Sequence, residues 1–139
     1  MQIVRKADSA VGNTKTFTVP DGKFWKVLYS HTAYTSTGTA GNRQFNISVK
    51  ASGSADAFDS AAGPVQAASL IRHYNGATGG NFREATFYNN ECNVPLPNEL
   101  ILLAGDTITF EDVTDVDALD TLSVNLTVIE GPLSLAGTV

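Results

Sequence analysis

One stretch constrains the fold more than any other: the run from Phe24 to Thr35, which follows the tripeptide Pro20-Asp21-Gly22. Proline fixes its own φ and glycine adopts positive φ at no steric cost, so this tripeptide favours a tight turn. The run contains neither proline nor glycine and is rich in aromatic and β-branched residues, which favour strands. A strand of this length would span roughly 40 Å, which is long for a single strand. The sequence therefore predicts a strand that crosses a whole domain.

Patterns elsewhere in the chain predict further strands at 16–19, 43–50, 65–74, 81–88, 99–103, 107–113 and 122–128. In the second of these, Arg43, Phe45, Ile47 and Val49 would face a core, and Asn46 and Ser48 would face water. The predicted connections are a small-residue loop at 36–42, a Gly-rich turn at 75–80, a long loop at 51–64 and an acidic loop at 114–120. Residues 94–97 contain two prolines and are expected to be extended, outside the centre of any sheet.

This series of strands, with no sustained helical stripe, predicts an all-β protein. We expect an antiparallel β-sandwich, jelly-roll-like, with about eight strands and little or no helix. A length of 139 residues favours one domain. We divide the chain into an N-terminal arm or edge strand (1–11), a single β-sandwich domain (12–132) and a C-terminal tail (133–139).

Composition narrows the possible partners. The net charge is −5, whereas a nucleic-acid-binding surface requires a field of lysine and arginine, so we expect no nucleic-acid partner. Charged residues make up only 17% of the chain, which suits a protein that packs against neighbours. The first residues lack the apolar segment of a secretory signal, and no apolar run is long enough to span a membrane. We therefore expect neither secretion by a signal peptide nor a membrane partner.

The single cysteine and the two histidines are weak candidates for chemistry. Cys92 has no second cysteine to pair with, and a nucleophilic role would require a histidine beside it. Both histidines, His31 and His73, lie in strand-like runs, so a buried thiol is the favoured interpretation of Cys92. The two histidines would share a metal if their strands were adjacent. No third ligand is implied, so structural or surface histidines are favoured.

Three other groups of residues have the composition of a possible site. An acidic cluster has the oxygen ligands that Ca²⁺ prefers but lacks the spacing of a calcium loop, so a solvated loop is favoured: Glu111, Asp112, Asp115, Asp117 and Asp120. Nothing in the sequence brings together a carboxylate pair for glycoside hydrolysis from Glu84, Glu99 and Glu111. Six aromatic residues could form a sugar-stacking platform but are more typical of a core: Trp25, Tyr29, Tyr34, Tyr74, Phe82 and Tyr88. We expect no catalytic, cofactor-binding or metal-binding residues and no enzymatic activity.

Three motifs carry a resemblance to a known class of proteins. They are VPDGKFWKVL at 19–28, AGNR at 40–43 and LPNELILLAGDTI at 96–108. In this order they resemble small virion proteins of tailed bacteriophages, in particular capsid decoration (cement) and other accessory head or tail proteins. The matching residues are Val19, Pro20, Gly22, Lys23, Trp25, Leu28, Gly41, Asn42, Arg43, Leu96, Pro97, Leu100, Leu102, Gly105, Asp106 and Ile108.

The resemblance implies a non-enzymatic virion structural protein with a jelly-roll-like sandwich. The first expectation is a decoration protein that binds the assembled shell as a homo-oligomer, commonly a trimer, and stabilises it. Its partners would be copies of itself and the major capsid protein or other virion proteins. Its location would be the virion, assembled in the cytoplasm of the bacterial host. Two alternatives stay open: a tail, vertex or fibre component of the same fold, and a carbohydrate-binding β-sandwich module.

On this interpretation, the contacts with neighbours would come from the N-terminal arm, the 51–64 loop and the apolar tail. The residues expected to make these contacts are Ile3, Val4, Arg5, Lys6, Phe58, Leu133 and Leu135.

Overall fold

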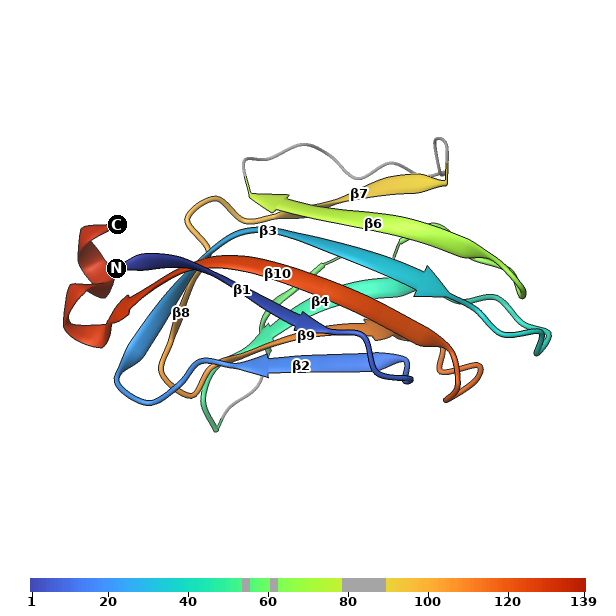
Figure 1. Cartoon of the computed structure of the whole chain (residues 1–139), viewed down its shortest axis with the longest axis horizontal. Helices are drawn as coiled ribbons and strands as arrows, with labels where there is room; N and C mark the ends of the chain where they lie inside the picture. The colour runs from blue at the N-terminus through green and yellow to red at the C-terminus, as the bar shows by residue number, and fades with distance from the viewer. Residues whose placement is uncertain (54–55, 61–62, 79–89) are drawn as a thin grey trace.

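The structure is a computed structural model that describes residues 1–53, 56–60, 63–78 and 90–139 (Figure 1). The elements in the described residues are the strands Gln2–Asp8 (β1), Thr14–Thr18 (β2), Lys23–Thr35 (β3), Phe45–Lys50 (β4), Asp56–Asp59 (β5), Ile71–Thr78 (β6), Glu91–Leu96 (β7), Ile101–Leu103 (β8), Thr107–Asp112 (β9) and Thr121–Pro132 (β10), and the 3-10 helix Leu133–Thr138 (η1). These strands form two sheets packed against each other, so the predicted all-β sandwich is confirmed.

The pairing of the strands is that of a jelly roll. Four antiparallel pairs are nested in chain order: β1 with β10, β2 with β9, β3 with β6, and β4 with β5. A long hairpin of such pairs, rolled up on itself, places alternate pairs in opposite sheets. The observed sheets contain the orders β1-β10-β3-β6 and β2-β9-β4-β5, as this winding requires.

Two additional strands extend the first sheet to six. Strand β8 pairs with the beginning of β3, and β7 pairs with β6 in parallel, which departs from the antiparallel pairing that the sequence predicts. The count is therefore about ten strands rather than eight. Strand β7 comes last in the order of the described sheet and contains Pro95, which has no amide hydrogen to donate.

Strand β3 is the predicted long strand, and it lies in the middle of the six-stranded sheet. It pairs with β10 over its whole length, from Lys23 opposite Pro132 to Thr35 opposite Thr121, with one register shift beside Thr127. Its other side pairs with β6 and β8. Together, β3 and β10 form the central pair on which the rest of this sheet is built.

The predicted strand at 65–74 begins too early, and the described part of the predicted turn, 75–78, is wrong because it belongs to a strand; residues 79 and 80 lie outside the described residues. Strand β6 begins only at Ile71 and continues to Thr78. Upstream of it, Gln66 forms an isolated bridge with Arg43 rather than part of a strand. The strand predicted at 81–88 lies outside the described residues.

The sequence Asn75-Gly76 is typical of a turn but lies inside β6, and the packing around Gly76 shows why glycine is needed there. A Cβ atom at this position would lie 2.4 Å from Oγ of Ser30 and 3.1 Å from Cδ1 of Ile47. Glycine inside a strand often marks such a close approach of a neighbouring chain segment. The crowding at Gly76 is therefore a requirement of packing, which the local sequence does not reveal.

Strand β5 lies within the segment predicted as a loop, and β4 is covered on both faces. Asn46 and Ser48, predicted to face water, are only 4% and 6% exposed. Asn46 donates hydrogen bonds from Nδ2 to Oδ1 of Asp59 at 2.7 Å and to the carbonyl of Ser60 at 2.8 Å. The segment around β5 therefore satisfies polar groups that would otherwise require water.

Phe45 joins the two sheets in the core. It belongs to β4 and is fully buried. Its ring centroid lies 4.4 Å from that of Tyr74 on β6 in the opposite sheet and 6.4 Å from that of Phe110 on β9. Stacked and tilted aromatic pairs at these distances add to the stabilisation from buried area.

Candidate functional site

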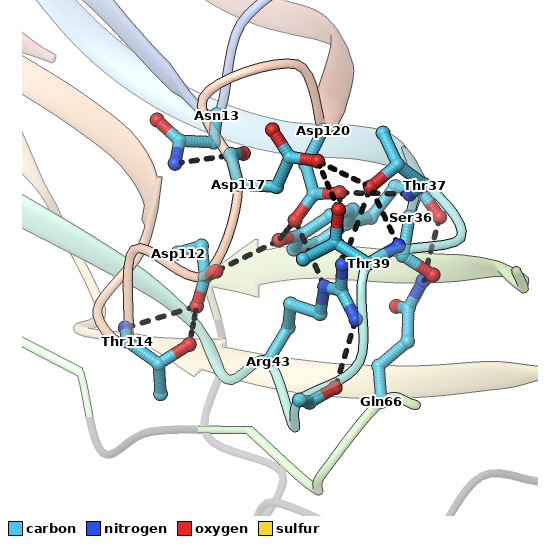
Figure 2. A network of polar contacts seen from close by, with 12 residues as sticks. Asn13, Ser36, Thr37, Thr39, Arg43, Gln66, Asp112, Thr114, Asp117 and Asp120 are labelled. Atoms are coloured by element: carbon cyan, nitrogen blue, oxygen red, sulfur yellow. Dashed lines mark hydrogen bonds and ion pairs between the residues drawn. The ribbon is translucent and has the colours of Figure 1, made fainter. Parts of the chain in front are cut away.

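The most extensive polar cluster lies at the end of the sandwich where β3 ends and β10 begins (Figure 2). At its centre, Arg43 and Asp120 form an ion pair, and both side chains are fully buried. Nε of Arg43 donates to Oδ2 of Asp120 at 2.9 Å, and the second guanidinium nitrogen donates to Oδ1 at 3.2 Å. This two-point contact is the strong geometry for an arginine–carboxylate pair. We call this cluster the polar network. Its members are Tyr34, Thr37, Thr39, Arg43, Asp112, Asp117 and Asp120.

Tyr34 connects the ion pair to a second buried carboxylate. Its hydroxyl lies 2.9 Å from Oδ2 of Asp112 and 3.2 Å from Oδ2 of Asp120, so two acceptors share one hydrogen. Burial, followed by the two negative charges, raises the pKa of Tyr34 far above its ordinary value. Asp112 also accepts hydrogen bonds from the amide of Gln44 and from both the amide and the hydroxyl of Thr114.

The acidic loop is attached to the end of β3 by hydroxyl groups. Thr37 and Thr39 donate to Oδ2 of Asp117 at 2.6 and 2.7 Å. The amide of Thr37 donates to Oδ1 of Asp120 at 2.8 Å. Hydrogen bonds from Thr37, from the Leu119 amide and from Thr39 lower the pKa of Asp117 to about 2. Burial raises the pKa of Asp120, but the hydrogen bonds and charge of Arg43 and the Thr37 amide outweigh it, and the net pKa is lowered.

The interpretation of the acidic cluster as a solvated loop is wrong for Asp112 and Asp120, which are 4% and 0% exposed. The carboxylates of the network instead accept hydrogen bonds from donors on other segments. Asp115 accepts one from Nδ2 of Asn13 at 2.7 Å. Within the described ranges, no three histidine, cysteine, aspartate or glutamate side chains are grouped to hold a metal ion. The polar network fits a structural role, because its hydrogen bonds link the residues that follow β3, the residues that precede β4 and the acidic loop.

Lowered carboxyl pKa values make the polar network sensitive to acid. Asp117 and Asp120 have a lower pKa in the folded chain than the ordinary 3.8. Their contribution to stability is therefore complete above that ordinary value and is lost as the pH falls toward the folded pKa, about 2 for Asp117. We expect the free energy of unfolding, from urea titrations, to fall between pH 4 and pH 2. Asp117→Asn should flatten part of this fall, and an unchanged slope would contradict the assignment.

The outer face of the six-stranded sheet, away from the four-stranded sheet, is a second candidate. Strand register aligns its residues in three rows across the sheet: Arg5, Thr127, Tyr29 and Ala77; Ala7, Asn125, His31 and Asn75; and Ser123, Ala33 and His73. A hydrogen bond from Arg5, followed by one with Thr127, lowers the pKa of Tyr29. This face is polar over its middle and carries both histidines of the chain.

The two histidines lie together on this face, on the adjacent strands β3 and β6. Their ring centroids are 5.2 Å apart, and the ring planes are 27° apart. Nε2 of His31 and Nδ1 of His73 are separated by 3.1 Å. His73 stands directly opposite Ala33, two residues along β3 from His31. We call these two residues the histidine pair.

The residues predicted as assembly contacts lie at several places. Ile3 and Arg5 are exposed on the outer face of β1, whereas Val4 packs against the core. Nζ of Lys6 lies 5.7 Å from the ring centroid of Trp25. Phe58 on β5 is partly buried against the core, far along the chain from the others. Leu133 and Leu135 are exposed on η1, at 40% and 39%.

The two termini lie beside each other (Figure 1), and of the predicted contact residues Ile3 lines a hollow there. A shallow apolar hollow is lined by Met1, Gln2, Ile3, Ile129 and Val139. Helix η1 begins next to it, with the amide of Leu133 donating to the carbonyl of Gly22 at 2.8 Å. We define the terminal patch as the apolar residues that line this hollow, Met1, Ile3, Ile129 and Val139.

Of the four described residues of the hypothetical sugar platform, three are buried in the core. Trp25, Tyr34 and Tyr74 are 0–2% exposed, as the core interpretation predicts. Tyr29 is 48% exposed, so that interpretation is wrong for this residue. Phe82 and Tyr88 lie outside the described residues.

The remaining candidates have structural positions. Cys92 is buried in β7, as expected. Glu99 forms an ion pair with Lys26 at 3.4 Å, and Glu111 lies on β9 in the other sheet. Glu84 is outside the described residues.

Comparison with protein-family models, with curated proteins and with solved structures finds no match for this chain. In the part of the chain that the structure describes, no helix has the length and apolar character needed to cross a bilayer.

Proposed function

We propose that the protein is a non-enzymatic structural component of a bacteriophage virion, and specifically a decoration protein that binds the assembled shell. The motifs that resemble small phage virion proteins support the proposal, and so does the jelly-roll winding of the strands. The observation that carries it is the terminal patch, where both ends of the chain place apolar side chains in the open.

The terminal patch has the character of a contact surface. Met1 and Ile3 are 62% and 65% exposed. Contiguous apolar surface that remains in water commonly marks a site of protein association. The patch includes part of β1, which lies at the edge of the sheet formed by the described strands, and an edge strand has backbone groups available for pairing with another chain. A partner could therefore bury the apolar side chains of the patch and pair a strand with β1 at the same place.

The proposed mechanism is stabilisation by mass action. A protein that binds the assembled shell but not its loose subunits shifts the equilibrium toward assembly. Binding across a joint between capsid subunits meets this condition, because the complete site exists only in the shell. We propose that the protein acts as a homo-oligomer, with a trimer as the first expectation, in which edge strands are hidden from solvent.

A charge placed in the terminal patch tests this proposal. We expect Ile3→Asp to weaken binding to particles at least tenfold, because a carboxylate would have to be buried unpaired in the contact. Stability should change by only about 0.5 kcal/mol, since Ile3 is exposed in the free chain. The measurement is cosedimentation with shells formed from the major capsid protein of the same virus. A deletion of β1 would be less informative, because it would uncover β10.

Leu119→Asp is the matched control, since Leu119 is 66% exposed but lies in the loop before β10 rather than at the termini. It should bind like the unmodified protein. Equal binding by both variants would contradict a role for the terminal patch. Mass spectrometry of purified virions adds the copy number: hundreds of copies fit decoration, a few fit a tail or vertex component, and none contradicts a virion role.

A further inference from the structure

The histidine pair has a geometry that the rest of the chain does not explain. The two nitrogens face each other on the outer face of the sheet, with both side chains only partly buried. They belong to strands that pair directly, so a rigid sheet fixes the separation of their backbones. Neither residue contributes to the core, to the polar network or to the terminal patch.

The separation of these nitrogens is close to that of two ligands on one metal ion. Zinc binds histidine nitrogen at about 2.0–2.1 Å in tetrahedral sites, which places two ligand nitrogens about 3.3 Å apart. Nε2 of His31 and Nδ1 of His73 are 3.1 Å apart. The separation therefore already fits a chelating pair, and rotation of the two rings would turn their lone pairs toward one ion.

We propose that His31 and His73 together chelate one divalent late transition metal ion, of the class Zn²⁺, Ni²⁺ or Cu²⁺, on the outer face of the six-stranded sheet. Imidazole nitrogen suits these ions, whereas Mg²⁺ and Ca²⁺ prefer oxygen ligands. The ligand atoms are Nε2 of His31 and Nδ1 of His73. In the neutral pair, the hydrogen between them moves to the other nitrogen of its ring, so both lone pairs face the ion.

The surroundings determine what kind of site this is. The described residues contain no third histidine, cysteine or carboxylate in a metal-binding group with the pair. Water would complete the coordination shell, and the side-chain amides of Asn75 and Asn125, which flank His31 in its row, are placed to hydrogen-bond such waters. A site with two protein ligands and open positions binds an exchangeable ion, unlike a closed structural zinc site.

The test is isothermal titration calorimetry, in which NiCl₂ or ZnCl₂ is added to the untagged full chain in a buffer that does not bind metals. We expect saturation at one ion per chain and no response to MgCl₂. The chain has only two histidines, so imidazole ligation can come only from this pair. His31→Ala and His73→Ala should each weaken binding at least tenfold, because each leaves a single nitrogen ligand.

Two further measurements keep the test independent of any effect of the substitutions on folding. Nitrogen NMR of the imidazole rings in the unmodified protein should show both rings shifting together during the titration. Asn93→Ala, a substitution on β7 opposite Asn75, should bind as the unmodified protein does. The proposal is overturned by an absence of saturable binding, by a single variant that binds within twofold of the unmodified protein, or by one ion per two chains.

Discussion

Replacing Arg43 with methionine is expected to destabilise the fold by about 3–5 kcal/mol, the usual effect of removing one partner from a buried ion pair. Methionine fills similar space but donates nothing, so Asp120 would remain fully buried without the guanidinium. A small domain has only about 5–15 kcal/mol of total stability, so the variant should unfold at a much lower urea concentration. Fluorescence of Trp25, the single tryptophan, reports the transition because its side chain is buried.

Lys26→Met is the matched control for Arg43→Met. Lys26 forms its ion pair with Glu99 near the surface, and Glu99 is 66% exposed. Such a pair contributes about 0–1 kcal/mol. Equal losses in the two variants would contradict the importance assigned to burial. Adding Asp120→Asn to Arg43→Met should recover part of the loss, because it removes the charge left without its partner.

Phe45→Ala is expected to have a comparable effect for a different reason. The substitution would leave a cavity between the sheets where the ring now contacts Tyr74 and Phe110. Truncation of a buried phenylalanine typically lowers the free energy of unfolding by about 3–5 kcal/mol. Urea titration at neutral pH measures this loss directly.

Phe58→Ala is the comparison for Phe45→Ala, since it removes the same atoms from a partly buried position on β5. We expect it to cost well under half as much. If Phe58→Ala were the more damaging change, the centre of the core would lie nearer β5 than the structure places it.

The strands that could be predicted from the sequence are those in which the local residue pattern matches the burial of each side chain. Strand β3 is an unbroken run of strand-favouring residues, and the side of β4 that carries Phe45 alternates regularly with its other side. For β3 and for the Phe45 side of β4, local pattern and packing agree. The other side of β4 departs from its pattern, because Asn46 and Ser48 are buried although the alternation predicts that they face water. Strand β10 was predicted too short, because Gly131-Pro132 resembles a strand end yet continues the pairing with β3.

The errors occur where contacts distant in sequence decide the structure. Gly76 resembles a turn residue, and only the closeness of Ser30 shows why glycine is needed inside β6. The parallel pairing of β7 with β6 has no local signal.

The polar network could be predicted only in part. Arg43 was placed on the core side of its strand, and an arginine there requires a buried acceptor. That acceptor, Asp120, lies 77 residues away, and no sequence rule selects it from the other acids of its loop. The sequence allows the two histidines to lie on adjacent strands but does not establish it. The pairing of β3 with β6 cannot be derived from the sequence, because the local pattern predicts the wrong bounds for β6.

The nested pairing of the strands has a consequence for how the chain acquires its structure. Strand β10, the last strand in the described residues, lies between β1 and β3. The centre of the first sheet therefore cannot form until both ends of the chain have met. Partners as distant as Gln2 and Glu130 must find each other, and such non-local contacts slow folding toward the millisecond-to-second range. During that search β3 has one long side without a partner, which makes the incomplete chain a substrate for chaperones and for misassociation with its neighbours.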